Sequence, residues 1–310
     1  MLVFDWHLDL AWNALEWNRD LSLPVAEIRR REVERGYTGP GRGTNTVSLP
    51  ALRDGRFAVV SATLLARHDR DWRPLGFIPK SGYESAEAAN AMALGQLAYY
   101  RALERRGLVR ILTDWPGFDA HVREWKAAER HETRDTRHET QPSSLSPPPL
   151  GFVISMEGAD PILSPQDVEE WWAAGLRIVS LSHYGKARYS HGTGTPGGLN
   201  VDGPALLREM ERVGMILDVT HLADEAMDQA LDLFGGTVLA SHHNCRALVP
   251  GQRQLADDQI RKLIARGAVI GTALDAWMLS PNWIRGQTRP REAGVTLQCM
   301  VDHMDHICQL

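Results

Sequence analysis

Histidines and carboxylates recur in this chain at one kind of place, the ends of short apolar segments. Seven residues follow this pattern: His7, Asp9, Glu157, His183, His221, His242 and His243. Neutral imidazole nitrogens and carboxylate oxygens are ligands that zinc prefers in proteins. The residue types and their positions therefore indicate a metal site.

The spacing of these residues indicates how they could share metal ions. His7 and Asp9 stand two residues apart, so on a strand their side chains point to the same side. A carboxylate has two oxygens and can bridge two cations, whereas an imidazole nitrogen cannot, so Glu157 among the histidines indicates a two-metal centre. His242 and His243 are adjacent, and the sequence leaves open which of them is the ligand.

Seven segments rich in Val, Ile and Leu predict the strands that position these side chains: residues 3–9, 57–65, 151–157, 177–183, 214–221, 236–242 and 267–274. Residues 108–112 form a weaker eighth candidate. Stretches with helical periodicity separate most of them, which is the pattern of repeated βα units and a parallel sheet. We therefore expect a (β/α)8 barrel of the TIM type, whose strands converge at their carboxyl ends on one mouth.

The whole chain is consistent with one such domain over residues 1–310, interrupted by a flexible surface insertion at 126–149 that is charged and rich in Ser and Pro. Apolar residues make up 43% and the net charge is −5, which disfavours nucleic acid as a partner. The three cysteines show no CxxC spacing, and no apolar stretch of about 20 residues predicts a membrane span. We expect a cytoplasmic protein with no membrane partner.

Two other motifs point to different chemistry and are disfavoured by their context. Gly192, Gly194 and Gly197 spell GxGxxG, but no strand runs directly into them and Pro196 interrupts them, unlike a dinucleotide-binding turn. Serines precede His183 and His242, but neither lies in the GxSxG turn of a serine hydrolase. The metal site remains the favoured interpretation.

An ordered set of segments along the chain resembles the renal or membrane dipeptidases, which are metallopeptidases (family M19) with a two-zinc barrel. The segments are DWHLDL, MEGAD, VSLSHYGKA, GMILDVTH, ASHHNCRALVPGQRQLADDQI and VDHMDHI. By this resemblance His7 and Asp9 hold one zinc ion, His221 and His242 hold the other, and Glu157 bridges them. The resemblance implies hydrolysis of dipeptides by a metal-bridging hydroxide.

The resemblance also implies two residues that contact the substrate. His183 matches the family histidine that contacts the substrate and stabilises the tetrahedral intermediate. Arg253, in the segment GQRQLADD, matches an arginine that binds the terminal carboxylate, a task that suits a guanidinium fork. The expected substrate is a dipeptide or a small amide.

The chain departs from the family pattern at its end. Family members continue to an eighth barrel strand, an aspartate that transfers protons, and closing helices, whereas this sequence ends at Leu310. We therefore expect a gap between the strands at 3–9 and 267–274 and little activity of the 310-residue form. Asp275 is the only nearby substitute for the missing aspartate.

Two further interpretations stay open at this point. A different metal-dependent amidohydrolase, acting on an N-acyl amino acid or a cyclic amide, could use the same ligands. A truncated, noncatalytic metal-binding form would hold metal without turnover. The oligomeric state is also open, with a homodimer as one candidate.

Overall fold

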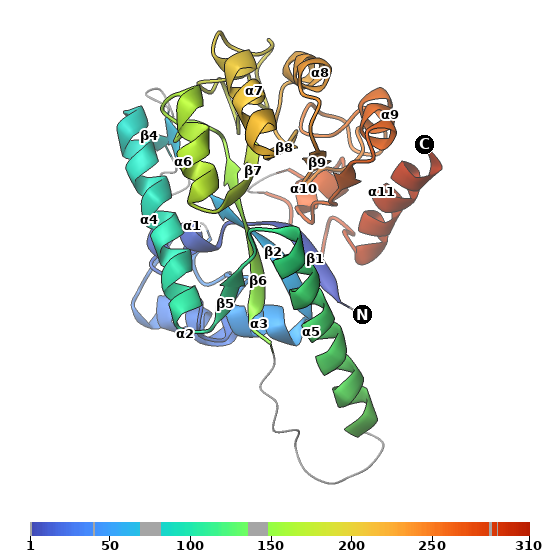
Figure 1. The fold of residues 1–310 in the computed structure, drawn as a ribbon. Coiled ribbons are helices and arrows are strands. Elements are labelled where there is room, and N and C mark those ends of the chain that lie inside the picture. The colour runs from blue at the N-terminus through green and yellow to red at the C-terminus, as the bar shows by residue number, and fades with distance from the viewer. Residues whose placement is uncertain (1, 40, 69–81, 136–147, 285–286, 290) are drawn as a thin grey trace. The chain divides into compact units, whose positions relative to one another are not determined.

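A computed structural model of the chain describes residues 2–39, 41–68, 82–135, 148–284, 287–289 and 291–310 (Figure 1). The chain forms two compact units. The first unit comprises Met1–Met156 and Ala173–Arg177, and the second comprises Glu157–Trp172 and Ile178–Leu310.

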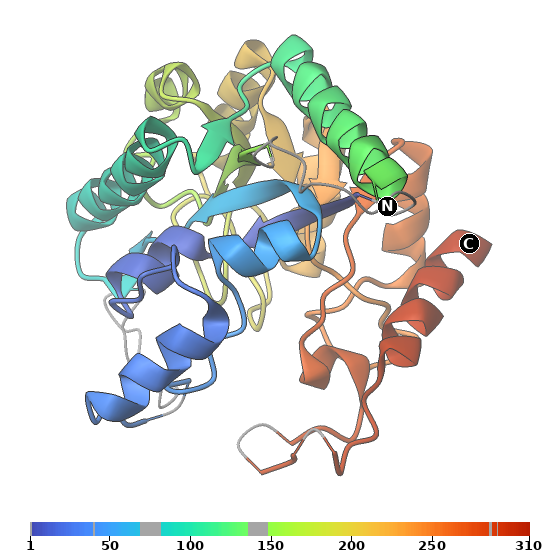
Figure 2. The same cartoon turned by 90° about the horizontal axis from the view of Figure 1, so that it is seen from below.

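The first unit contains a parallel sheet in the order β1–β2–β6, and β5 also pairs with β6. Figure 2 shows β1 and β2 lying side by side. The strands of this unit are β1 (Val3–Leu8), β2 (Phe57–Leu64), β3 (Arg67–His68), β4 (Gly82–Tyr83), β5 (Val109–Ile111) and β6 (Leu150–Glu157). β3 and β4 pair with each other in a separate two-stranded sheet. Its helices are α1 (Leu10–Leu15), α2 (Val25–Glu34), α3 (Leu49–Asp54), α4 (Ala86–Arg105) and α5 (Trp115–Asp135).

The sequence explains why β2 and β6 form the centre of this sheet. Both strands are almost continuously apolar, and nearly every residue of each is buried, as expected for a parallel strand covered on both faces. Helix α4 begins where the Ser85 side chain accepts a hydrogen bond from the backbone N–H of Ala88. The helix is followed by Gly107 at φ +70°, a left-handed position that glycine adopts readily.

The second unit contains a second run of parallel strands, in the order β7–β8–β9–β10. These strands are β7 (Leu176–Ser180), β8 (Ile216–Asp218), β9 (Val238–Ala240) and β10 (Val269–Ile270). The helical elements are the 3-10 helix η1 (Pro165–Asp167), α6 (Val168–Ala173), α7 (Gly203–Val213), α8 (Asp224–Leu233), α9 (Asp257–Ala265), α10 (Ala276–Leu279) and α11 (Leu297–Gln309). Strands therefore alternate with helices through most of this unit.

Helix α11 is held to the rest of the second unit by a buried histidine. His303 is 1% exposed, and its Nδ1 accepts the backbone N–H of Cys245 at 3.0 Å. The Cys245 thiol lies 3.4 Å from the carbonyl oxygen of His303. On the surface, His306 pairs with Asp257 of α9 at 2.9 Å. One buried and one exposed contact thus fix the last helix.

The observed strands agree with the sequence. All seven predicted segments contain a strand, and the weaker segment at 108–112 contains β5. The alternation of parallel strands and helices confirms the predicted α/β class. Within its own unit β1 pairs with one strand, β2, and β10 pairs with one strand, β9. The gap predicted between residues 3–9 and 267–274 stays a prediction, as does the single-domain organisation.

The expected flexible insertion at 126–149 is partly wrong. Residues 126–135 continue α5, while residues 136–147 lie outside the described part of the chain. The charged composition suggested a loop, but Lys, Ala, Glu and Arg are good helix formers on an exposed face. The buried Trp125, whose indole N–H donates to the carbonyl of Pro149, fixes this part of the helix to the chain that returns to β6.

In the described parts of the chain, none of the helices combines the length and the apolar character needed to cross a bilayer.

Candidate metal centre

Glu157 is the centre of the site in the second unit. It is the last residue of β6, it is buried, and it is followed by Gly158 at φ +82°. A residue with a Cβ is strained at this φ, so glycine allows the chain to leave the strand sharply. The turn leaves the carboxylate of Glu157 at the carboxyl end of its strand.

Three imidazole nitrogens surround this carboxylate. Nε2 of His221 lies 3.2 Å and Nε2 of His242 lies 3.3 Å from Oε1 of Glu157. Nε2 of His183 lies 3.7 Å from Oε2. The ring centroids of His183 and His221 are 4.4 Å apart, and those of His221 and His242 are 5.2 Å apart. Ligand atoms of Glu157, His183 and His221 are close enough to one another to hold a metal ion.

His221 is held in an unusual backbone conformation. It lies three residues beyond β8, at φ +69°, a left-handed position that few non-glycine residues adopt. Thr193 Oγ1 lies 3.0 Å from His221 Nδ1 and donates to the His221 carbonyl oxygen at 3.3 Å. Because that hydroxyl proton is used, Nδ1–H is the donor to Thr193. The lone pair of Nε2 therefore faces Glu157.

His242 is oriented by a chain of two buried residues. Ser241 Oγ donates to Asp218 Oδ2 at 2.5 Å and lies 2.7 Å from Nδ1 of His242. Since the serine proton goes to the carboxylate, Nδ1–H of His242 donates to the serine. Asp218 Oδ1 also accepts the backbone N–H of Ser241, which fixes this residue relative to β8. The remaining Nε2 lone pair of His242 faces Glu157.

The adjacent His243 has a different position. It is buried and its Nδ1 lies 3.4 Å from Nη1 of Arg253. Burial, ahead of the positive charge of Arg253, holds the pKa of His243 well below its ordinary value. Of the two candidates, His242 is the one whose ring nitrogen faces Glu157.

Arg253 is buried beside the same segment. It is 5% exposed, and its Nη2 donates to the carbonyl oxygen of His242 at 2.9 Å. Burial lowers the pKa of Arg253, while the nearby hydroxyl of Tyr184 and carboxylates of Glu157 and Asp275 act in the opposite direction. The guanidinium is thus held against the backbone of a candidate metal ligand.

His7 and Asp9 lie in the first unit. His7 is on β1, whereas Asp9 follows the strand at the N-cap of α1, so the expected HxD motif is only partly on the strand. The two side chains still face one another, with His7 Nε2 3.6 Å from Asp9 Oδ2. His7 Nδ1 lies 3.4 Å from the Thr63 hydroxyl. The Asp9 carbonyl accepts from Asn13 at 3.0 Å.

These residues fit zinc. In the second unit, His221 and His242 present Nε2 lone pairs to a carboxylate, an arrangement of acceptors that a cation stabilises. Burial, ahead of the charge of Arg253, holds the pKa of His221 well below its ordinary value, so this imidazole is neutral, as a metal ligand must be. In the first unit, Asp9 Oδ1 is buried with no hydrogen-bond partner among the described residues.

The residues that orient these histidines were not identified from the sequence. Thr193 comes from the glycine-rich stretch that spells GxGxxG, so the loop dismissed as a nucleotide motif supports His221. Asp218 belongs to the segment DVTH, and Ser241 belongs to SHHN, where the sequence was interpreted only as lacking the turn of a serine hydrolase. For Ser241, its position directly before the candidate ligand His242 was the available signal.

Parallel strands that end in histidines around a buried carboxylate are typical of metal-dependent hydrolases on α/β barrels. The family model described as membrane dipeptidase (peptidase family M19) matches residues 1–310. The chain belongs to this family.

Individual relatives are distant. A protein of Acinetobacter calcoaceticus, described as uncharacterized, is 25% identical over 167 residues, which are 51% of this chain and 51% of that protein. The dipeptidase tcpJ of Claviceps purpurea is 31% identical over 137 residues, or 43% of this chain and 30% of that protein. The matched segments thus span about half or less of these relatives' own length.

Solved structures show the same fold. A metallopeptidase of Rhodobacter sphaeroides, liganded with a phosphinate mimic of the dipeptide L-Ala-D-Ala, has a TM-score of 0.69 at 20% identity, covering 100% of this chain and 82% of that chain. A dipeptidase described as a metallopeptidase of family M19 also has a TM-score of 0.69, at 21% identity, covering 100% of this chain and 81% of that chain. The predicted barrel-type α/β fold is thereby confirmed.

Proposed function

We propose that this chain carries the active site of a zinc-dependent dipeptidase that hydrolyses dipeptides with a free C-terminal carboxylate. The observation that carries the proposal is the convergence of His183, His221 and His242 on the buried carboxylate of Glu157, at 3.2 to 3.7 Å. Family membership supports this choice of activity over the other reactions that such a site can perform.

The proposed ligand set is the one that the family resemblance implies. His221 and His242 would hold one zinc ion, His7 and Asp9 would hold the other, and Glu157 would bridge the two. The support is the donor chemistry of each group, the unpartnered Asp9 Oδ1 and the family resemblance. When bound, two ions lower the pKa of a shared water and polarise the scissile carbonyl.

The chain's own residues would supply binding and orientation. A half-buried His183 next to Glu157 is suited to donate a hydrogen bond to the carbonyl oxygen as negative charge develops there. Arg253 is suited to bind the terminal carboxylate, because its planar guanidinium can donate two parallel hydrogen bonds. The Rhodobacter structure with a dipeptide mimic supports a substrate of this size.

The test is a zinc titration of chelator-treated protein, followed by assay of L-Ala-D-Ala hydrolysis. We expect zinc to bind and to restore a low level of hydrolysis, in keeping with the weak activity expected of the 310-residue form, and we expect Glu157→Gln to abolish both tight zinc binding and turnover. Glu170→Gln, at an exposed glutamate of α6 in the same unit, is the matched control and is expected to behave as the parent protein.

The other outcomes identify the alternatives. Hydrolysis of an N-acetyl amino acid without hydrolysis of the dipeptide would indicate a different amidohydrolase. Zinc binding that depends on Glu157 without any turnover would indicate a metal-binding form. Zinc binding that is unchanged in Glu157→Gln would contradict the proposed site itself.

A further inference from the structure

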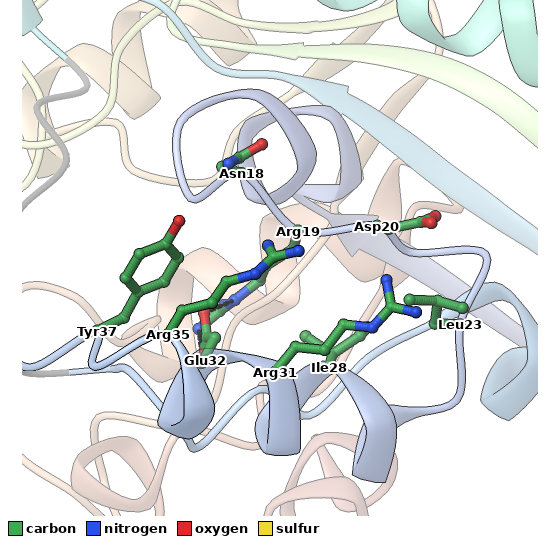
Figure 3. Close-up of a pocket in the computed structure, with 9 residues that line it drawn as sticks. All are labelled: Asn18, Arg19, Asp20, Leu23, Ile28, Arg31, Glu32, Arg35 and Tyr37. Atoms are coloured by element: carbon green, nitrogen blue, oxygen red, sulfur yellow. Dashed lines mark hydrogen bonds and ion pairs between the residues drawn. The ribbon is translucent and has the colours of Figure 1, made fainter.

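A polar cavity lies in the first unit, among residues that take no part in the proposed metal site. Its volume is about 350 Å³, and Figure 3 shows it between α2 and the segment around Asn18 and Asp20. Cavities that bind small molecules commonly start at about this size. Arginines supply most of its charge: Arg19, Arg31 and Arg35 all line it.

Two of these arginines lie at the C-terminal end of α2. Arg31 is in the helix and Arg35 is the capping residue that follows it, four positions later, so their side chains are neighbours. Figure 3 shows both side chains extending toward the segment that carries Asn18 and Asp20. Arg31 uses its Nε to bind Glu27 at 2.6 Å. Among the described residues, the Arg35 guanidinium has no carboxylate partner.

The acidic residues of the cavity do not neutralise this pair. Glu32 is buried, and its carboxylate accepts from Arg19, from Arg42 and from the backbone N–H of Gly43. The negative charge of Glu32 is therefore balanced by Arg19 and Arg42 within the wall of the cavity. Asp20 lies at the other side, where its Oδ1 accepts from the backbone N–H and the hydroxyl of Ser22. Because Arg31 is paired with Glu27, the positive charge of the cavity that has no carboxylate partner among the described residues is that of Arg35.

We propose that this cavity binds a small oxyanion, a carboxylate or a phosphate, between Arg31 and Arg35. An oxyanion would give the Arg35 guanidinium the carboxylate-like partner that it lacks among the described residues, and the terminal nitrogens of Arg31 could donate to the same ligand. A guanidinium group suits a carboxylate and a phosphate equally, because it can donate paired hydrogen bonds to two oxygens of either. Asn18, at φ +52° in the opposite wall, offers an amide donor to the same ligand. The site is independent of the proposed peptidase activity.

The test is isothermal titration calorimetry of the 310-residue protein at low ionic strength, with inorganic phosphate and with succinate as probes. We expect Arg35→Gln to weaken binding about tenfold, and Arg31→Gln to weaken it by a similar factor. Arg30→Gln is the matched control, because Arg30 lies on the same helix and carries the same charge but does not line the cavity. It is expected to change affinity less than about twofold.

The two probes distinguish the source of the oxyanion. Binding of phosphate alone assigns a phosphate ligand, and binding of succinate alone assigns a carboxylate ligand. The proposal is overturned if neither probe binds, or if Arg30→Gln weakens binding as much as Arg35→Gln. Thermal melts of each variant establish that a loss of binding does not reflect unfolding.

Discussion

The carboxylate of Asp218 is buried behind His242, with the hydroxyl of Ser241 between them. This arrangement selects the ring tautomer in which Nδ1 carries the proton and Nε2 is free for a metal. Asp218 and Ser241 are therefore positioning residues, since they act on the metal site only through His242. Their contribution is measurable apart from turnover.

We expect Ser241→Ala to lower zinc affinity by about 10- to 100-fold, which is the usual effect of removing a partner that orients a ligand. Competition with a chelating dye measures this affinity. Ser190→Ala is the control, since Ser190 is a buried serine of the same unit that contacts the Ser182 hydroxyl instead. Equal affinities of Ser241→Ala and the parent protein would exclude the positioning role.

Arg253 is the second residue whose role can be isolated. In an active form of the protein, Arg253→Met should lower kcat/KM for a free dipeptide by a factor that corresponds to about 2 to 4 kcal/mol of transition-state stabilisation, the range for losing one partner of a desolvated charge pair. A dipeptide amide, which has no terminal carboxylate, should be hydrolysed no worse by the variant than by the parent. A variant that still prefers the free dipeptide over the amide as strongly as the parent would rule out carboxylate binding by Arg253.

At the scale of elements, the loop after β7 determines where His221 lies. The loop approaches itself closely at Gly192, where an added Cβ would be 2.1 Å from the carbonyl oxygen of His183. The next residue, Thr193, holds His221. Bulk at position 192 would therefore displace both histidines from Glu157.

Gly192→Ala should destabilise the protein by about 3 kcal/mol, because backbone atoms must move to admit the methyl group. It should also weaken zinc binding. Gly194→Ala is the matched control: its φ of +88° is unfavourable for alanine, but no atom lies within 4 Å of the added Cβ. We expect it to cost about 1 kcal/mol with little effect on zinc. Chemical denaturation measures the free energy of unfolding of each variant. Similar losses of stability in the two variants would contradict the steric argument.

The sequence predicted the elements better than their ends. Strands β2 and β6 are apolar along their length, so their identity is a local property that periodicity reveals. His183 and His221 lie three residues beyond β7 and β8, where the backbone leaves the regular strand pattern. The His183 carbonyl oxygen accepts from the Thr193 N–H, and the Thr220 N–H donates to the Asp218 side chain. Ser180, for example, donates to the carbonyl of Thr220. Such contacts join residues far apart in sequence, and no single segment encodes them.

At the scale of the whole molecule, buried histidines link stability to pH. In the described part of the chain, burial lowers the pKa of His121 in the first unit and of His221, His243 and His303 in the second. Each is neutral when folded but takes up a proton in the unfolded chain below its ordinary pKa of 6.5. Their contribution to stability is thus complete above that pH and is lost as the pH falls toward the lowered values.

We therefore expect the melting temperature of the metal-free protein to decrease as the pH is lowered from 7 to 5, a range that includes the ordinary histidine pKa of about 6.5. His303→Asn should make the fall shallower, because the asparagine oxygen can accept the Cys245 N–H at every pH in this range. Differential scanning calorimetry at several pH values gives the comparison. Parallel curves for the variant and the parent would show that His303 does not contribute.

Because α11 covers Cys245, the rate at which this cysteine is modified reports how often the helix opens. Cys308 is exposed and Cys299 is partly exposed, whereas Cys245 is completely buried under His303, and burial raises the pKa of its thiol to about 11. A thiol-selective reagent attacks the thiolate, so it should modify the first two cysteines promptly and the third only during moments when the helix lifts away. The rate of that slow third modification, read by mass spectrometry, counts the openings of one helix in an otherwise folded protein.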